Sequence, residues 1–111
     1  MFYFFLLSFE LVILFIMNVI KLDNEHSFAI ENLDKQVRLV VYNKGVENVC
    51  RKSTLKSIAW FIQSGEDHLF KGRLQLKKMA EGIGVVVKNS LVGEINKKDF
   101  INCLEEAKSG I

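Results

Sequence analysis

Apolar and polar side chains alternate most clearly between residues 70 and 77. The apolar members of this stretch fall on one face of an extended strand: Phe70, Leu74 and Leu76. The polar and basic members fall on the other face: Lys71, Arg73, Gln75 and Lys77. Because side chains on a strand point to opposite faces in turn, this alternation predicts a strand with one buried face.

Two further strands are predicted directly after this stretch. Residues 83–88 and 91–95 carry apolar side chains at alternate positions, and valine is frequent among them, which favours strands. Asn89-Ser90 lies between them, and asparagine tolerates the positive φ that a two-residue hairpin turn requires. The C-terminal half is therefore expected to begin with three antiparallel strands.

An amphipathic helix is predicted after residue 95. Asn96 is a good N-cap, and Asp99 places a carboxylate in the first turn, where the helix dipole favours negative charge. The apolar positions that follow recur at helical spacing: Phe100, Leu104 and Ala107. We expect the helix to end near Lys108.

The N-terminal half shows the same kinds of pattern. Strands are predicted over residues 19–22, 27–30 and 37–43, and the last of these is rich in β-branched side chains. Residues 46–52 are interpreted as a polar connection. A helix is predicted over residues 53–64, where Ser53 or Thr54 can serve as the N-cap.

The helix over residues 53–64 has a wide apolar arc. The face expected to be buried consists of Leu55, Ile58, Ala59 and Ile62. Trp60 and Phe61 lie beside this face and widen the arc beyond what one sheet contact needs, which favours an interface. We therefore predict a homo-oligomer with Trp60, Phe61 and Tyr42 at the interface. The alternative is that the N-terminal hairpin covers these side chains.

These elements follow one another in the order βββ-α-βββ-α. Sheets and helices must bury their apolar faces against one another, so the order predicts an α+β fold. We expect an antiparallel sheet with both amphipathic helices packed on one face. A chain of 111 residues fits one domain that can bury a core without disulfides. Cys50 and Cys103 show no metal or redox spacing and are expected to be reduced, although a single disulfide is an alternative.

Residues 1–16 form an apolar leader that differs from the rest of the chain. Residues 1–20 contain a single charge, at Glu10, and as a helix they would cross a bilayer core of roughly 30 Å. Met17 stands just before the first predicted strand. Two interpretations follow. Either Met17 is the true start of a cytoplasmic domain over residues 17–111, or the leader anchors that domain on the cytoplasmic side of the inner or plasma membrane.

The basic strand face is the one functional signal in the sequence. The residues expected to contact an anionic partner are Lys71, Arg73, Gln75 and Lys77 of this face, with Lys88 of the neighbouring strand. The alternative for Lys88 is that it points inward. Such a face can hold the phosphates of a nucleic acid or a nucleotide-like ligand. Three cations before the first helix can add to it: Lys44, Arg51 and Lys52. The alternative is a solvated strand face on which lysines prevent edge pairing.

No catalytic, metal or cofactor motif is recognisable. The Gly-Ile-Gly run at residues 82–84 lacks the third glycine of a dinucleotide fingerprint, and a bulge or bend is the simpler explanation. The Glu-Asp-His run at residues 66–68 has no second cluster of ligands beside it in the sequence. The sequence therefore predicts a non-enzymatic binding module without cofactor or metal. The alternative is an interaction domain tethered by one N-terminal transmembrane helix.

Overall fold

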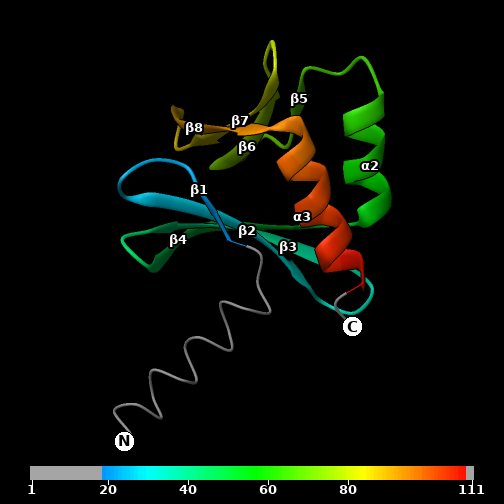
Figure 1. Cartoon of the computed structure of the whole chain (residues 1–111), viewed down its shortest axis with the longest axis horizontal. Coiled ribbons are helices and arrows are strands. Elements are labelled where there is room, and N and C mark those ends of the chain that lie inside the picture. Colours follow the sequence, from blue (N-terminus) through cyan, green and yellow to red (C-terminus); the bar gives the residue numbers. More distant parts are fainter. Residues whose placement is uncertain (1–18, 110–111) are drawn as a thin grey trace, which may run out of the picture.

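The computed structural model describes residues 19–109. Within them the chain forms two four-stranded antiparallel sheets, of order β1-β2-β3-β4 and β5-β6-β7-β8 (Figure 1). The predictions for the leader over residues 1–16 and for a membrane anchor over residues 1–20 lie outside the described residues. Neither helix of the described part is long and apolar enough to span a bilayer.

Each half of the described chain is a four-stranded meander that ends in a helix. The first half consists of β1 (Ile20–Lys21), β2 (His26–Asn32), β3 (Val37–Asn43), β4 (Val46–Ser53) and α2 (Leu55–Gln63). The second half consists of β5 (His68–Leu69), β6 (Leu74–Lys78), β7 (Gly82–Val87), β8 (Ser90–Asn96) and α3 (Lys97–Ser109). The predicted α+β class is confirmed. The predicted order differs, because each half has one strand more than the sequence pattern indicates.

The additional strand of the first half is β4, which covers the residues interpreted as a polar connection. β4 pairs with β3 along its length, with Val49 opposite Val41 and Arg51 opposite Leu39. Within β4 only Val49 is buried. The strand is therefore held by its ladder to β3, and it lacks the apolar alternation that a sequence pattern would detect.

In the second half, β6 begins four residues later than the predicted strand over residues 70–77, at Leu74. Phe70 takes a positive φ of 74°, which turns the chain after the short strand β5. Residues 70–73 therefore form a loop. The following hairpin turn is also displaced by one residue, since Lys88–Asn89 forms it with φ values of 50° and 71°.

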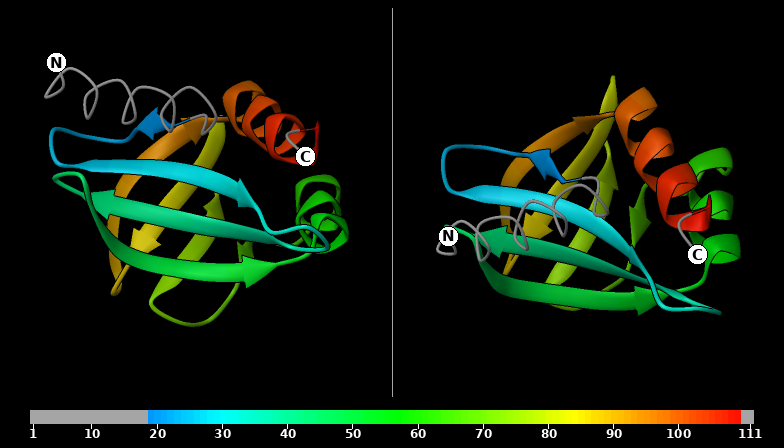
Figure 2. Two further views of the ribbon diagram at one scale, coloured as in Figure 1. Left: turned by 90° about the horizontal axis from the view of Figure 1, so that it is seen from below. Right: turned by 60° about the horizontal axis from the view of Figure 1, so that its bottom comes forward.

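The core lies between the two sheets and continues under the helices, drawing residues from both sheets and both helices. Figure 1 shows α2 and α3 side by side at one end of the molecule, and Figure 2 shows the strands of one sheet crossing those of the other. α3 follows the second sheet but also packs on β2 of the first. The rings of Phe28 and Phe100 stack there with centroids 5.9 Å apart. The prediction of one sheet with both helices on one face is therefore corrected to two sheets joined through α3.

Both helices begin where the sequence predicts. The Thr54 hydroxyl accepts a hydrogen bond from a first-turn amide of α2 at 3.1 Å. The Asn96 side chain accepts one from the Lys98 amide at 2.8 Å, which caps α3. The buried face of α2 is turned relative to the prediction, because Ile58 and Phe61 are both fully buried. Phe61 therefore belongs to the core and is not available for an interface.

The two sheets share one structural device. In each, a two-residue turn with positive φ at both positions joins the third and fourth strands: Lys44–Gly45 in the first sheet and Lys88–Asn89 in the second. In each, the ladder shifts register just before this turn, between Val41 and Tyr42 in the first sheet and at the equivalent place in the second. The two halves therefore share the same strand order, turn and bulge.

Candidate anion-binding site

The candidate site lies at the end of the second sheet where the loop over residues 70–73 meets the β7–β8 turn. The Lys88 amide donates a hydrogen bond to the Arg73 carbonyl at 2.8 Å. This bond joins two cationic residues that are distant in sequence. Lys71 lies in the same loop as Arg73, and all three residues are exposed.

Arg51 joins this group from the first sheet. Its guanidinium carbon lies 4.7 Å from the centroid of the Phe70 ring. It also lies beside the loop backbone, since a Cβ added at Gly72 would be 3.7 Å from its Nη1 atom. A cation–π contact at an exposed site contributes about 0.5–1 kcal/mol, and this one holds the guanidinium near the loop. The basic end is defined here as Arg51, Lys71, Arg73 and Lys88.

The loop that carries Lys71 and Arg73 is anchored at both sides. Phe70 is half-buried and packs against the core. The Gln75 side-chain amide donates a hydrogen bond to the Gly72 carbonyl at 3.0 Å. Gln75, predicted to contact a ligand, therefore braces the loop. Lys71 and Arg73 therefore lie in a loop that is held to the core by Phe70 and to β6 by Gln75.

No carboxylate of residues 19–109 forms an ion pair with the basic end. The ion pairs of this part of the chain join other groups: His26–Asp23, Arg38–Glu31, Arg38–Glu47 and Lys44–Glu25. Exposed cations gathered without a neutralising carboxylate create a positive potential that attracts anions. The basic end can therefore hold phosphate or carboxylate groups by charge and by donated hydrogen bonds.

The structure separates Lys77 from Lys71, Arg73 and Lys88, and leaves it beside Gln75 on the same face of β6. Lys77 points outward from β6, where it pairs with Gly84 on one side and with His68 on the other. The single strand face predicted for the cations is not formed, because Lys71 and Arg73 lie in the loop before β6 and only Gln75 and Lys77 lie within the strand. Lys71 and Arg73 reach Lys88 through the loop instead of through strand alternation.

The two other predicted cations lie elsewhere. Lys44 is in the β3–β4 turn of the first sheet, with its ammonium 3.9 Å from Glu25 Oε2. Lys52 pairs with Arg38 in the first sheet and shares its outward face. Of the three additional cations predicted before α2, the structure brings only Arg51 to the basic end.

Tyr42, predicted at an interface, lies in a polar network on the outer face of the first sheet. Its hydroxyl donates a hydrogen bond to Glu31 Oε2 at 2.9 Å. Arg38 bridges Glu31 and Glu47 at 3.0 and 2.6 Å. Burial, together with the bond to Glu31, raises the pKa of Tyr42 to about 12. The hydrogen bond from Arg38 lowers the pKa of the Glu47 carboxyl. These groups satisfy one another and leave little for an external ligand.

The remaining candidates for chemistry are dispersed. Cys50 is exposed in β4, whereas Cys103 is buried in α3, where burial raises the pKa of its thiol to about 11. Across residues 19–109, no three His, Cys, Asp or Glu side chains gather as a metal site. Gly84 lies within β7, where an added Cβ would be 2.7 Å from Met79 Sδ and 2.9 Å from Leu91 Cδ1. The Gly-Ile-Gly run is therefore part of a strand and not a bend.

Sequence reasoning placed Arg51 in a connection and Phe70 inside the sheet, so their contact was not foreseen. One usable signal exists. The Asn43-Lys44-Gly45 turn follows a strong strand and precedes Val46, which predicts a returning strand. A regular returning strand would place Arg51 opposite Arg38, and the bulge between Val41 and Tyr42 shifts the pairing so that Arg51 lies opposite Leu39. The turn signal thus predicts the strand but not this register.

Comparison of the chain with protein-family models, with curated proteins and with solved structures gives no match. What the chain binds has to be inferred from its own residues.

Proposed function

We propose that the chain is a small, non-enzymatic nucleic-acid-binding module that contacts phosphates through the basic end. Four exposed cations from three separate segments, Arg51, Lys71, Arg73 and Lys88, supply the charge. Phosphate contacts made by lysine and arginine dominate the affinity of proteins for nucleic acids. Arginine adds a planar fork that can bind one phosphate through two hydrogen bonds.

One observation carries this proposal. The Lys88 amide bonds to the Arg73 carbonyl, and the equivalent bond in the first sheet runs from the Lys44 amide to the Glu25 carbonyl. At the first turn the Lys44 ammonium lies 3.9 Å from Glu25 Oε2, whereas at the second turn the two residues that the bond joins are both basic. Like charges so placed repel one another, and a bound anion removes that repulsion.

The spread of the cations favours a polymer over a single nucleotide. Arg51 comes from the first sheet, Lys71 and Arg73 from a loop, and Lys88 from a turn. A nucleic-acid backbone offers repeated phosphates to such a row of cations, whereas one nucleotide offers its phosphates at one point. Binding is therefore expected to be strong at low salt and to show modest base preference.

The test is a salt titration of the full-length chain in mild non-ionic detergent with fluorescein-labelled single-stranded and duplex oligonucleotides, followed by anisotropy. Four phosphate contacts predict a slope of log affinity against log salt of about −3 to −4 on the duplex, since each contributes about −0.9. Arg73→Glu is expected to weaken binding by roughly tenfold or more, because it replaces a cation with a repelling carboxylate.

The control is Lys35→Glu, an exposed lysine in the loop between β2 and β3 that undergoes the same charge change. It is expected to leave the affinity within about twofold of wild type, because Lys35 is outside the proposed contact surface. Absence of salt-dependent binding at low salt, or equal affinity of wild type and Arg73→Glu, would contradict the proposal.

We further propose that Trp60 contributes to self-association. It is 57% exposed on α2, whose opposite side buries Ile58 and Phe61. Tryptophan is the side chain most often found as an energetic anchor of protein interfaces. Sedimentation equilibrium is expected to show an oligomer for wild type and a smaller species for Trp60→Ser. An unchanged mass for the variant would exclude Trp60 as an anchor.

A further inference from the structure

A cavity of about 420 Å³ lies at the opposite end of β6 and β7 from the basic end. Its walls come from the C-terminal end of α2, the β6–β7 loop and the first residue of α3. The side chains that matter for its chemistry are Ile62, Gln63, Lys78, Glu81, Ile83 and Lys97. Small-molecule sites in proteins typically measure about 300–1,000 Å³, so this cavity is large enough for a small ligand.

Lys78 is a cation that faces the inside of the molecule. It pairs with Ile83, which is 3% exposed, and follows the fully buried Leu76 by two positions on the same strand face. Its ammonium donates a hydrogen bond to the Ser64 carbonyl and lies 5.1 Å from the centroid of the Phe61 ring. A carbonyl and a ring hold this charge in place without neutralising it, and a part-buried charge is costly without an anion nearby.

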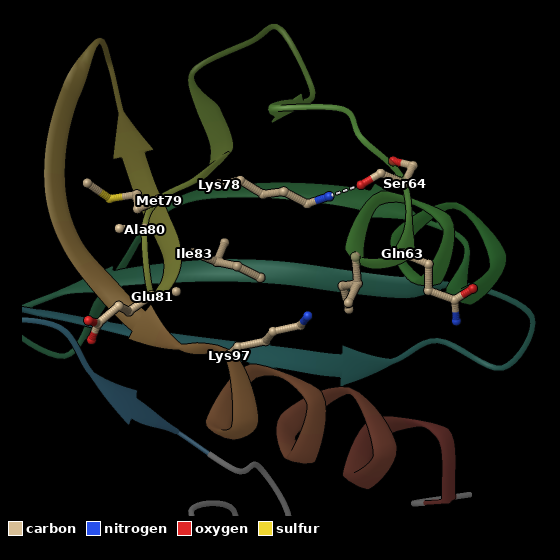
Figure 3. A pocket seen from close by; sticks show the side chains of 10 residues that line it. Gln63, Ser64, Lys78, Met79, Ala80, Glu81, Ile83 and Lys97 are labelled. Carbon is tan, nitrogen blue, oxygen red and sulfur yellow. Dashed lines mark hydrogen bonds between the residues drawn. The ribbon is translucent and has the colours of Figure 1, made fainter.

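Lys97 brings a second ammonium to the cavity from the start of α3. Figure 3 shows Lys78 and Lys97 on opposite sides of Ile83, both extending toward the side of the cavity where Gln63 lies. Neither lysine forms an ion pair within residues 19–109. The Glu81 carboxylate lies at the other side and is turned away from both ammonium groups (Figure 3).

We propose that this cavity binds a small monocarboxylate with an apolar body. Lys97 and Lys78 donate hydrogen bonds to the carboxylate, and the apolar body rests on Ile62 and Ile83. The two lysines and Glu81 give the lining one net positive charge, which a single carboxylate neutralises. No arginine lines the cavity to bind a phosphate dianion through paired hydrogen bonds, so the lining favours the weaker monoanion.

The test follows the Ile62 and Ile83 methyl resonances of the full-length chain by NMR during titration with hexanoate, hexanol and inorganic phosphate. Hexanoate is expected to shift both methyls saturably. Hexanol, which has the same chain length, is expected to bind at least roughly tenfold more weakly because it lacks the bond between carboxylate and ammonium. The methyl of Ile30, a core residue that does not line the cavity, serves as the internal reference.

Lys97→Met removes one ammonium at an exposed position and is expected to weaken hexanoate binding roughly tenfold. Lys98→Met is the matched control, since Lys98 is the next residue and does not line this cavity. Lys78→Met is expected to act like Lys97→Met.

Four results would overturn the proposal. They are the absence of saturable shifts with hexanoate, an equal response to hexanol, a stronger response to phosphate, and unchanged affinity in Lys97→Met. None of these results bears on the basic end, because the two sites share no residue.

Discussion

The two turns that close the repeated hairpins have the same backbone but opposite electrostatics. Both begin with a lysine at positive φ, Lys44 at 54° and Lys88 at 50°. In each half, the lysine amide donates a hydrogen bond to the carbonyl of the residue just before the second strand. This residue is Glu25 before β2 and Arg73 before β6. The Lys44 ammonium lies 3.9 Å from the Glu25 carboxylate, whereas the backbone of Lys88 is bonded to a second basic residue, Arg73. The equivalent hydrogen bond therefore joins a base to an acid in the first half and two basic residues in the second.

The outer faces of the two sheets also differ in polarity at equivalent positions. Equivalent positions beside the bulges hold Tyr42 opposite Glu47 in the first sheet and Val86 opposite Leu91 in the second. In the first sheet Tyr42 and Glu47 belong to a network with Arg38 and Glu31 that is satisfied internally. In the second sheet Leu91 is 54% exposed. At this position the first sheet therefore holds a polar pair that is satisfied internally, and the second sheet holds an apolar pair with an exposed leucine.

The largest expected effect comes from breaking the contact that joins the halves. Phe100→Ala empties a fully buried position that stacks on Phe28 of the other half. Loss of a buried phenylalanine side chain costs about 3–5 kcal/mol of unfolding free energy. Urea denaturation is expected to show one cooperative transition at a lower midpoint. Leu91→Ala, at an exposed position, should change stability by no more than about 0.5 kcal/mol.

A smaller effect is expected from the network that only the first half possesses. Tyr42→Phe removes the hydrogen bond to Glu31 and should lower stability by about 1 kcal/mol at neutral pH. The pKa of Tyr42 is raised to about 12 in the folded chain, above its ordinary value near 10. The stability that the Tyr42 hydroxyl contributes is therefore fully present below pH 10 and is lost as the pH rises toward 12. Denaturation midpoints should converge for wild type and variant over this range; a constant difference would contradict the assignment.

The smallest effect is expected from variants that exchange the charges of the two turns. Arg73→Glu gives the second turn the acid–base arrangement of the first and should raise stability by about 0.2–1 kcal/mol. Glu25→Lys makes the converse change and should lower stability by a similar amount. Thermal denaturation at low salt measures both, and high salt should reduce both. A stabilised Arg73→Glu that no longer binds nucleic acid would separate function from folding.

Sequence patterns predicted the elements that carry their own local signal. The α+β class, the caps at Thr54 and Asn96 and the buried face of α3 follow from local side-chain chemistry and helical spacing. β4 was missed because it has almost no apolar alternation and forms through its ladder to β3. Local patterns do not register a strand that is held mainly by its partner.

The sequence predicts most of the residues of the candidate site but not how they are arranged. The sequence predicts Lys71, Arg73 and Lys77 on one strand face, but Lys71 and Arg73 lie in a loop that follows the positive φ of Phe70. Arg51 reaches the loop from the other sheet, and no spacing along the sequence indicates such a contact. The packing of the two sheets against each other depends on the whole core, and it determines which cations lie close together.

The matched pair Lys88→Glu and Lys44→Glu tests the central claim most directly. Both variants place the same charge change at the same position of equivalent turns, so they differ only in the surroundings. Anisotropy titrations with labelled oligonucleotide at low salt are expected to show a loss of roughly tenfold or more for Lys88→Glu. Lys44→Glu is expected to retain wild-type affinity within about twofold, because it lies outside the basic end. Equal losses in both variants, or no loss in either, would contradict a nucleic-acid site at the second turn.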